Sequence, residues 1–514
     1  MLKCVRHYIS KKHKGQIDIV KEWMKTSSGT ARHFSVGSHS NDRSNPSIFT
    51  VGSRHYKGLD DSQSPRLTPH QVTTILRLNE TSIEENNGAI RGFETNQLRS
   101  NNPIEDRRGE AKLPHGNKYL FGVYDGHAGC ACAQALNERL FNYLAVALSP
   151  SEVVERVKNG EIDLDKELLH WYHGGVEYRH SELRELYDKS LRKFARENLT
   201  NFSDDQYVPD ILMQAFLRLD EDIGSEALPV TTNSVLNGNT SSVLNTELLT
   251  IAFAGAVACV AYIDGTDMFV ANVGDCRAVL GVNKGADNWE AKELTQQHDA
   301  NNESEVNRIL KQHPNESNNV IKNGRLFGDL APFRAFGDVR YKWHAKDLKH
   351  IMNTNRFPHS FISVYGDKLL PNNYNTPPYL IAEPEIKYHQ LSPKDKFLVL
   401  ASDGLWDMIS PEKVIQLVAG HMDGRQVLVN FDLPRENMTL GAINQLLTQR
   451  KKSFANKTVD SNVATHLIRN AIGQDHLQLS AQLTLPNSIS RFYRDDITVT
   501  VVFFDSDYIM DNVT

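Results

Sequence analysis

The chain has 514 residues, of which 40% are apolar and 23% are charged. This length corresponds to two to four ordinary domains, or to one large fold with insertions. The composition excludes a mainly disordered chain, a collagen-like fibre and a coiled-coil rod. The longest apolar stretch, residues 250–263, is shorter than the roughly twenty residues that cross a bilayer. It predicts a buried strand, and we expect no transmembrane segment.

The net charge of −6 is unevenly distributed along the chain. Residues 1–58 hold eleven Lys and Arg against three acidic residues, a net charge of +8, which leaves −14 for the remainder. An acidic body argues against nucleic-acid binding, because a duplex binder needs a basic face. The basic, Ser- and His-rich start is typical of a mitochondrial transit peptide, and its three acids also fit a disordered basic tail. We therefore expect residues 1–60 to be a transit peptide or a disordered leader.

Ordered structure is predicted to begin at Thr68. The run Thr68-Pro-His-Gln71 combines an N-cap, a proline at the first helical position and the partner of a capping box. Residues 82–110 are predicted to be a polar loop. Residues 119–124 are typical of a buried strand, which a turn at 125–129 and a helix at 130–148 should follow.

Further along the chain, helical and strand patterns are mixed. Residues 152–206 are charged and helical, 208–224 predict an amphipathic helix, and 228–244 predict a loop. Apolar, β-branched runs predict strands at 249–264, 268–273, 277–282, 380–388, 397–402 and 497–504. Helices are predicted at 411–419 and 463–473, and irregular insertions at 345–378 and 420–458. Strands without strict alternation with helices indicate an α+β layered fold.

Aspartates stand at the tips of four apolar strands: Asp125, Asp275, Asp403 and the pair Asp495-Asp496. Glu105 and Asp106 lie in a polar segment shortly before the first of these strands. Convergent carboxylates repel one another unless a cation lies between them. Oxygen-only ligands favour Mg²⁺ or Mn²⁺ over Zn²⁺, and two such ions about 4 Å apart could clamp a phosphoryl displacement. A single Asp-Gly after a strand is an ordinary turn signal, so this prediction depends on the whole set.

His127 lies two residues after Asp125. Beside a metal centre it could protonate a leaving alkoxide. The alternative is an ordinary histidine whose ring is satisfied by a local hydrogen bond.

Nine segments occur in the order found in the metal-dependent Ser/Thr phosphatases of the protein phosphatase 2C family. They are Glu105-Asp106, FGVYDGHAG (121–129), AGAVACVA (254–261), VANVGDCRAVL (270–280), LTQQHDANNESEVNRI (294–309), FRAFGD (333–338), AEPEI (382–386), LVLASDGLWD (398–407) and RDDITV (494–499). The chain thus resembles this family over residues 104–504. The resemblance implies a β-sandwich of two antiparallel sheets flanked by α-helices. One catalytic domain should span 67–507, with insertions near 152–206, 345–378 and 420–458.

The resemblance also implies a role for individual residues. Asp125 should bridge two Mg²⁺ or Mn²⁺ ions, with a metal-bridging hydroxide as nucleophile, and Gly126 should offer its carbonyl. Asp403 and Asp495 should bind the same centre, and Asp106 should be a ligand.

Four further positions carry weaker implications from the family pattern. Glu105 should act on the metals through water, Asp275 should bind a weaker third ion, and His127 should be the general acid. Asn101 stands where several members have a phosphate-binding arginine, so the phosphate would be held by the Asn101 amide, by another group or by the metals.

Longer stretches resemble one subfamily, the mitochondrial pyruvate dehydrogenase phosphatases. They include LTPHQVTTILRLNE (67–80), NNPIEDRR (101–108), DGHAGCACAQAL (125–136) and LAPFRAFGDVRYKW (330–343). This resemblance implies the mitochondrial matrix and a substrate phosphoserine on the alpha subunit of pyruvate dehydrogenase. It also implies docking on a lipoyl domain of the dihydrolipoyl acetyltransferase core, stimulation by Ca²⁺ and a regulatory subunit.

Two other classes of protein compete with an active phosphatase. The first is a catalytically inactive phosphatase-fold scaffold, which would be expected to lose metal ligands, whereas Asp106, Asp125, Asp403 and Asp495 are present. The second is a two-metal nuclease, against which the acidic body counts.

Overall fold

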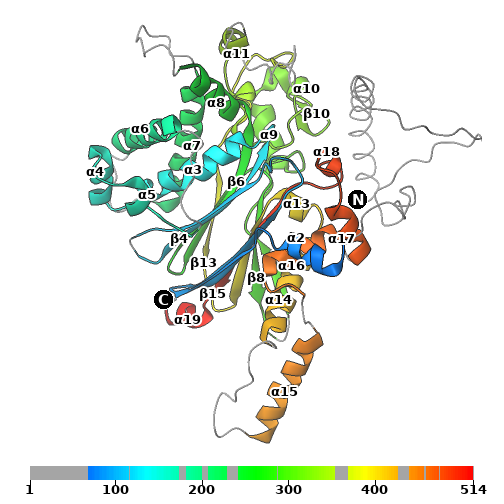
Figure 1. Ribbon diagram of the computed structural model, residues 1–514. Helices are drawn as coiled ribbons and strands as arrows, with labels where there is room; N and C mark the ends of the chain where they lie inside the picture. Colours follow the sequence, from blue (N-terminus) through cyan, green and yellow to red (C-terminus); the bar gives the residue numbers. More distant parts are fainter. Residues whose placement is uncertain are drawn as a thin grey trace, which may run out of the picture. The chain divides into compact units, whose positions relative to one another are not determined.

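Two antiparallel sheets lie at the centre of the computed structural model, which describes residues 67–114, 116–172, 181–198, 207–228, 241–285, 288–352, 369–426, 439–455, 459–473 and 475–512 (Figure 1). The first sheet has the strand order β1 (Thr81–Asn87), β2 (Ile90–Leu98), β15 (Ile497–Phe504), β14 (Asp395–Ala401), β8 (Arg277–Asn283), β9 (Trp289–Glu293). The second has the order β13 (Glu385–Gln390), β7 (Asp267–Val273), β6 (Gly255–Asp264), β4 (Lys118–His127), β3 (Arg107–Lys112), β5 (His170–Trp171), with β12 (Phe336–Gly337) paired to β6. The predicted leader, 1–60, lies outside the described residues.

Alternation along the central strands explains why the two sheets stack. In β14, Leu398 and Leu400 belong to the core between the sheets, whereas Phe397 and Val399 belong to a second core under helices. This two-residue period is what a strand buried on both faces requires. The rings of Phe93 on one sheet and Phe121 on the other meet edge to face, with centroids 5.2 Å apart.

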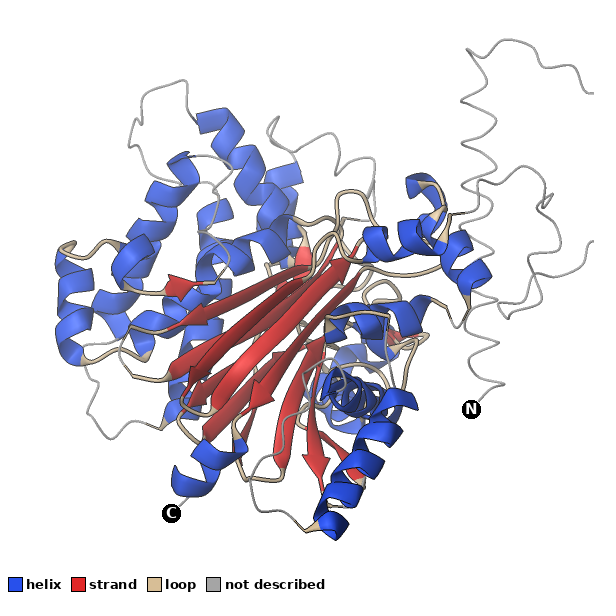
Figure 2. Cartoon of the chain, turned by 60° about the horizontal axis from the view of Figure 1, so that its bottom comes forward, coloured by secondary structure: helices blue, strands red, loops and turns tan. Residues whose placement is uncertain are grey.

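Helices cover both outer faces of the sandwich (Figure 2). The second sheet is covered by α3 (Ala131–Ala147), α7 (Val208–Ala227) and α8 (Ser241–Phe253), with α4 (Ser151–Asn159), α5 (Leu164–Glu167) and α6 (Ser181–Asn198) around them. The first sheet is covered by α14 (Pro411–Gln426), α16 (Val463–Ile472), α2 (Pro69–Leu76) and α17 (His476–Leu483). The expected α+β fold, a helix-flanked sandwich of antiparallel sheets, is therefore confirmed.

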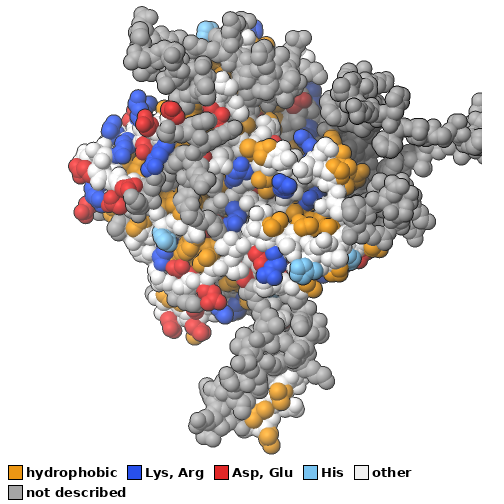
Figure 3. Space-filling model, viewed as in Figure 1, with side chains coloured by type: hydrophobic (Ala, Val, Ile, Leu, Met, Phe, Trp, Pro, Cys, Tyr) orange, Lys and Arg blue, Asp and Glu red, His pale blue; other side chains and the backbone are white. Residues whose placement is uncertain are grey.

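The remaining described elements are short, apart from one helix. They are α9 (Glu303–Gln312), α10 (Ser317–Val320), β10 (Ile321–Lys322), β11 (Arg325–Leu326), α11 (Ala345–Met352), α13 (Asp403–Trp406), α15 (Leu440–Ala455), α18 (Asn487–Ser490) and α19 (Ser506–Asn512), with 3-10 turns at Pro314–Glu316 and Val339–Tyr341. Helix α15 exposes the apolar side chains Leu440 and Leu447. Figure 3 shows hydrophobic side chains on the surface at the bottom of the view, where Figure 1 places this helix. Within the described ranges, no helix is both long and apolar enough to cross a membrane.

Several sequence predictions are confirmed in detail. The capping box between Thr68 and Gln71 is formed and opens α2. The last strand runs over Ile497–Phe504, as predicted, and α16 ends one residue before the predicted end. These segments have strong local signals, since caps and uninterrupted β-branched runs depend little on the rest of the fold.

The prediction of a polar loop over 82–110 is wrong, because β1, β2 and half of β3 lie there. Glu94 and Asn96 of β2 are buried and hydrogen-bonded. The Asn96 amide donates to the Leu76 carbonyl and to Thr465 Oγ1, both at 2.7 Å. Glu94 accepts from the backbone N–H of Val463. A strand whose polar groups are satisfied by neighbouring helices carries no hydrophobic alternation.

Three other boundaries differ from prediction. The apolar run 250–263 is divided: residues up to Phe253 end α8 and β6 begins at Gly255, because an all-apolar run does not distinguish a buried helix from a strand. The strand predicted at 380–388 begins only at Glu385, after Pro384, which cannot donate to a ladder. The turn expected at 125–129 begins later, because β4 continues through His127.

The insertions also differ in part from their predicted form. Residues 345–352 form α11, and the described part of 420–458 contains the end of α14 and all of α15. His421 on α14 is fully buried, so this part of the segment belongs to the core. Residues 229–240, most of the predicted 228–244 loop, lie outside the described residues, and 241–244 belong to α8.

We expect Asn96→Ala to lower the free energy of unfolding by about 1–3 kcal/mol, because the buried carbonyl of Leu76 loses its donor. Denaturant unfolding of the purified chain measures this. Asn301→Ala, at an exposed position, is the control and should stay within about 0.5 kcal/mol of the parent. Equal effects of the two substitutions would contradict the structural role of Asn96.

Candidate metal centre

Strand register brings the predicted acids of the first sheet to one end. In β14, Ala401 lies opposite Val499 of β15 on one side and Arg277 of β8 on the other. Asp403 follows β14, Asp495 precedes β15, and Asp275 precedes β8. All three aspartates therefore lie at the same end of the strands of this sheet.

The second sheet contributes two more acids at the same end. Arg107, the first residue of β3, lies opposite Tyr124 of β4. Asp106 directly precedes Arg107 and Asp125 directly follows Tyr124. The antiparallel register therefore makes the two aspartates neighbours. The turn between β7 and β8 crosses from the second sheet to the first and carries Asp275.

The electrostatics confirm that these carboxylates are neighbours. Burial raises the pKa of Asp125 well above its ordinary value. Like charges add to this rise, from Asp106, Asp403, Asp275 and Asp495. Burial also raises the pKa of Asp403, and Asp275, Asp495, Asp407 and Asp106 add to it. Protonation relieves this repulsion, and a cation bound between the carboxylates would relieve it while leaving them ionised.

Asp106 lies deepest in the group, with 1% of its surface exposed. Burial and the charge of Asp496 raise its pKa to about 7, although hydrogen bonds oppose the rise. Its Oδ2 accepts from Ser402 Oγ at 2.8 Å and from Thr498 Oγ1 at 2.7 Å. These donors come from the end of β14 and from β15, so Asp106 also ties the two sheets together.

Asp496 has a structural role beside the site. Its carboxylate accepts from the backbone N–H groups of Ser100, Asn101 and Glu105, the last at 2.7 Å. The Asn101 amide donates to Asp496 at 3.1 Å and to Asp495 at 3.4 Å. Asn101 is therefore close to the predicted ligands, and its amide is directed at carboxylates.

Glu105 lies directly before Asp106, in the segment that leads into β3. Its Oε1 accepts from the Gly129 N–H at 2.7 Å. Burial raises the pKa of Glu105, and the positive charge of Arg491 opposes the rise. Sequence reasoning missed Arg491, because no motif marks it and only the fold brings it near the acids.

Gly126 is a glycine for a steric reason. A side chain at this position would place a Cβ 2.6 Å from the carbonyl oxygen of Glu105. Only glycine therefore lets β4 pass this close to the segment that carries Glu105 and Asp106.

The Asp275 turn is held from behind by a buried histidine. The Gly274 backbone N–H donates to the ring nitrogen Nδ1 of His298 at 3.0 Å. The backbone N–H of His298 in turn donates to the Gly274 carbonyl at 2.9 Å. Burial raises the pKa of Asp275 to about 6, an effect that the charge of His127 reduces. Asp407 also raises it. Sequence reasoning missed Asp407, although its spacing from Asp403, one helical turn, was a usable signal.

His127 lies at the end of β4 and contacts an acid from a distant segment. Its Nε2 is 2.6 Å from Asp338 Oδ2. Burial works against a protonated ring, but the charge and hydrogen bond of Asp338 outweigh it, so the pKa of His127 is raised.

The donor set fits hard divalent cations. The convergent groups are carboxylates, with the Gly126 backbone among them, and their mutual repulsion is what such ions relieve. As the side chains stand in the described part of the chain, no three His, Cys, Asp or Glu residues form a group tight enough to ligate one ion. The carboxylates are thus neighbours across the end of the sandwich, and the predicted ligand roles stay predictions.

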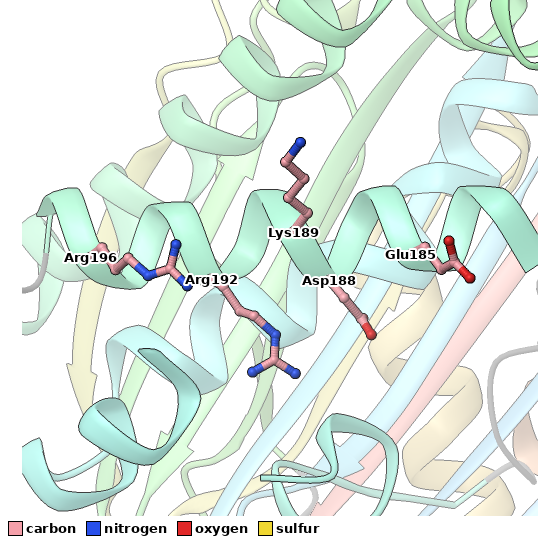
Figure 4. Close-up of a pocket in the computed structure, with 5 residues that line it drawn as sticks. All are labelled: Glu185, Asp188, Lys189, Arg192 and Arg196. Atoms are coloured by element: carbon pink, nitrogen blue, oxygen red, sulfur yellow. The ribbon is translucent and has the colours of Figure 1, made fainter. Parts of the chain in front are cut away.

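A separate cavity of about 300 Å³ lies on α6 (Figure 4). It is lined by Glu185, Asp188, Lys189, Arg192 and Arg196. Its arginines are used to hold α4: Arg192 donates to the Val157 carbonyl at 2.9 Å and Arg196 to the Lys158 carbonyl at 3.1 Å. This cavity results from helix packing, and none of the predicted metal ligands lines it.

Similarity to known proteins identifies the family of this chain. The sequence profile of protein phosphatase 2C matches residues 180–464. The mitochondrial [pyruvate dehydrogenase [acetyl-transferring]]-phosphatase 1 of Homo sapiens is 42% identical over 477 residues, covering 89% of this chain and 86% of the relative. Human phosphatase 2 of the same type is 41% identical over 474 residues, covering 89% of this chain and 87% of its own length. A protein phosphatase 2C homologue of Schizosaccharomyces pombe is 33% identical, covering 88% of both chains. The chain therefore belongs to the protein phosphatase 2C family and is a protein phosphatase.

Proposed function

We propose that this protein is a metal-dependent Ser/Thr phosphatase of the mitochondrial matrix that dephosphorylates, and so reactivates, the alpha subunit of pyruvate dehydrogenase. One observation carries the catalytic part: carboxylates from both sheets converge at one end and raise one another's pKa. The substrate and the location rest on the names of relatives that are 41–42% identical over most of the chain.

The proposed roles follow the positions of the acids. Two Mg²⁺ or Mn²⁺ ions would be held by Asp106, Asp125, Asp403, Asp495 and the Gly126 carbonyl, with Glu105 acting through water and Asp275 holding a weaker third ion. When bound, the ions would supply charge stabilisation for the phosphoryl oxygens and an activated water.

His127 and Asn101 would complete the site with groups of the chain itself. His127 would give a proton to the oxygen of the leaving serine, so that no alkoxide is released. Asn101, whose amide lies among the acids, would contact phosphate only by turning from its present acceptors, Asp495 and Asp496.

The alternative is an inactive scaffold with a phosphatase fold. The convergence of Asp106, Asp125, Asp403 and Asp495 favours the enzyme, because mutually repelling acids lower the stability of the fold and a scaffold would gain nothing from them.

Regulation and targeting are further parts of this proposal. We propose docking on a lipoyl domain of the dihydrolipoyl acetyltransferase core, stimulation by Ca²⁺, a regulatory subunit, and an import leader in residues 1–60. They rest on the subfamily resemblance and on the +8 charge of the first 58 residues.

Turnover should require added Mg²⁺ or Mn²⁺, and Asp125→Asn should lower it by more than about 100-fold. The substitution removes one of several repelling charges, so we expect no loss of thermal stability in the chelated protein, but a smaller Mg²⁺-induced rise in Tm. Asp507→Asn, at an exposed position, is the control. Full turnover after exhaustive chelation would refute the metal mechanism.

His127→Ala should slow hydrolysis of a phosphoserine peptide by about 10² to 10⁴-fold. An aryl phosphate should be affected little, because its leaving group departs without a proton. Steady-state kcat on both substrates tests this, and equal slowing would remove His127 as the acid.

The purified enzyme should act faster on phosphorylated pyruvate dehydrogenase when the acetyltransferase core is present. The physical reason is effective concentration: docking near the substrate raises the local encounter frequency. A free phosphoserine peptide is the control substrate and should show no acceleration. Absence of any effect on the complex would leave only the general phosphatase activity.

A further inference from the structure

The acid that contacts His127 comes from a segment 211 residues away in sequence. Asp338 ends the FRAFGD run, directly after β12. In the pair, 28% of the His127 side chain is exposed, against 5% for Asp338. The carboxylate is thus behind the ring, and the ring forms the open end of the pair.

The backbone at Asp338 is held in an unusual conformation. Its φ of 49° lies in the left-handed region, which a residue with a side chain rarely adopts. Its N–H donates to the Ala254 carbonyl at 3.0 Å. The preceding Gly337 has φ 65°, and a Cβ there would collide with the same carbonyl oxygen. Residues 337 and 338 are therefore fixed against the start of β6. The strained backbone at Asp338 is the cost of placing its carboxylate beside His127.

Space for the pair is kept by a second glycine. Gly255 lies opposite His127 in the β4–β6 register. A Cβ on Gly255 would collide with both His127 Nε2 and Asp338 Oδ2. The two side chains therefore meet in the volume that a side chain at position 255 would occupy.

A further ion pair supports the turn from α7. Asp220 Oδ1 accepts from the Gly337 N–H at 2.9 Å. Lys342 Nζ donates to both Asp220 oxygens at 2.7 Å and to the Ala335 carbonyl at 2.8 Å. The turn that carries Asp338 is thus held on both sides, by β6 and by α7.

We infer that Asp338 is a positioning residue that orients His127 for proton donation. This inference rests on the proposed function, in which His127 is the general acid. The Asp338 carboxylate accepts a hydrogen bond from Nε2–H. This bond fixes the tautomer and the plane of the ring, and it leaves Nδ1 as the nitrogen that faces the leaving oxygen.

The proton balance of the step is simple. As a water-derived oxygen bonds to phosphorus and the P–O bond to serine breaks, the Nδ1 proton of the imidazolium moves to the serine oxygen, and the products are inorganic phosphate and a neutral serine hydroxyl. The proton on Nε2 stays on the now neutral imidazole and remains hydrogen-bonded to Asp338, whose carboxylate is ionised throughout. Nδ1 then takes a proton from solvent before the next turnover.

Asp338→Asn tests the inference, because it keeps the shape and removes the charged acceptor. We expect kcat on a phosphoserine peptide to fall by about 10–100-fold, with KM unchanged. Hydrolysis of an aryl phosphate should change less than threefold. Asp338→Glu should recover part of the lost peptide activity.

The double variant His127→Ala/Asp338→Asn should be no slower than His127→Ala alone, since a positioning residue has no effect once its partner is gone. Multiplicative losses would overturn the inference.

A second buried Asp–His pair supplies the matched control. Asp395 is 2% exposed, and its Oδ2 lies 3.0 Å from His389 Nε2, at the opposite end of β14 from Asp403. Asp395→Asn should lower Tm without changing the ratio of peptide to aryl phosphate rates. The same change of ratio in this control would show that general destabilisation causes it.

Gly255→Ala covers the case in which Asp338→Asn fails to fold. It keeps both side chains and separates them, so it should produce the same selective loss on the peptide. If His127→Ala slows both substrates equally, the acid role in the proposed function fails. If His127→Ala is selective while Asp338→Asn and Gly255→Ala are not, the positioning role alone is refuted.

Discussion

Mutual repulsion among buried carboxylates is the constraint on which the site depends. Asp125 and Asp403 each lie within the field of several other acids, and burial removes the water that would screen them. A fold tolerates such a group only when its backbone is held by interactions elsewhere. Here the hydrogen bonds of Asp106 to Ser402 and Thr498, and those of Asp496 to three backbone N–H groups, supply that support.

The two halves of the chemistry have different supports. The predicted metal ligands leave strand ends of both sheets, where register fixes them. The proposed general acid His127 and its partner Asp338 lie on the second sheet and beside α7, where two glycines and the Lys342–Asp220 pair define the space they occupy. A substitution in one half can therefore leave the other intact, which is why leaving-group dependence and metal dependence are separable measurements.

Much of the fold and of the acid set could be predicted from sequence, because both have local signals. The strand 497–504 and the Thr68 capping box need no tertiary information, and aspartates at strand tips follow from the strands themselves. What failed depends on partners distant in sequence. The strand β2 carries the polar residues Glu94 and Asn96, which mask its strand pattern and which bind groups of α2 and α16, far away in sequence. Asp338 and Arg491 acquire their acidic neighbours only in three dimensions.

The packing between the sheets also sets a dimension of the site. Asp106 and Asp125 belong to one sheet, whereas Asp403 and Asp495 belong to the other, so the distances between them vary with the thickness of the core. That thickness is filled by side chains such as Phe93 and Phe121, far from the carboxylates along the strands. Interdigitated cores yield little to compression. The aromatic layer is thus a spacer that sets the separation between two groups of charges, so side chains that never touch the site help to fix its dimensions.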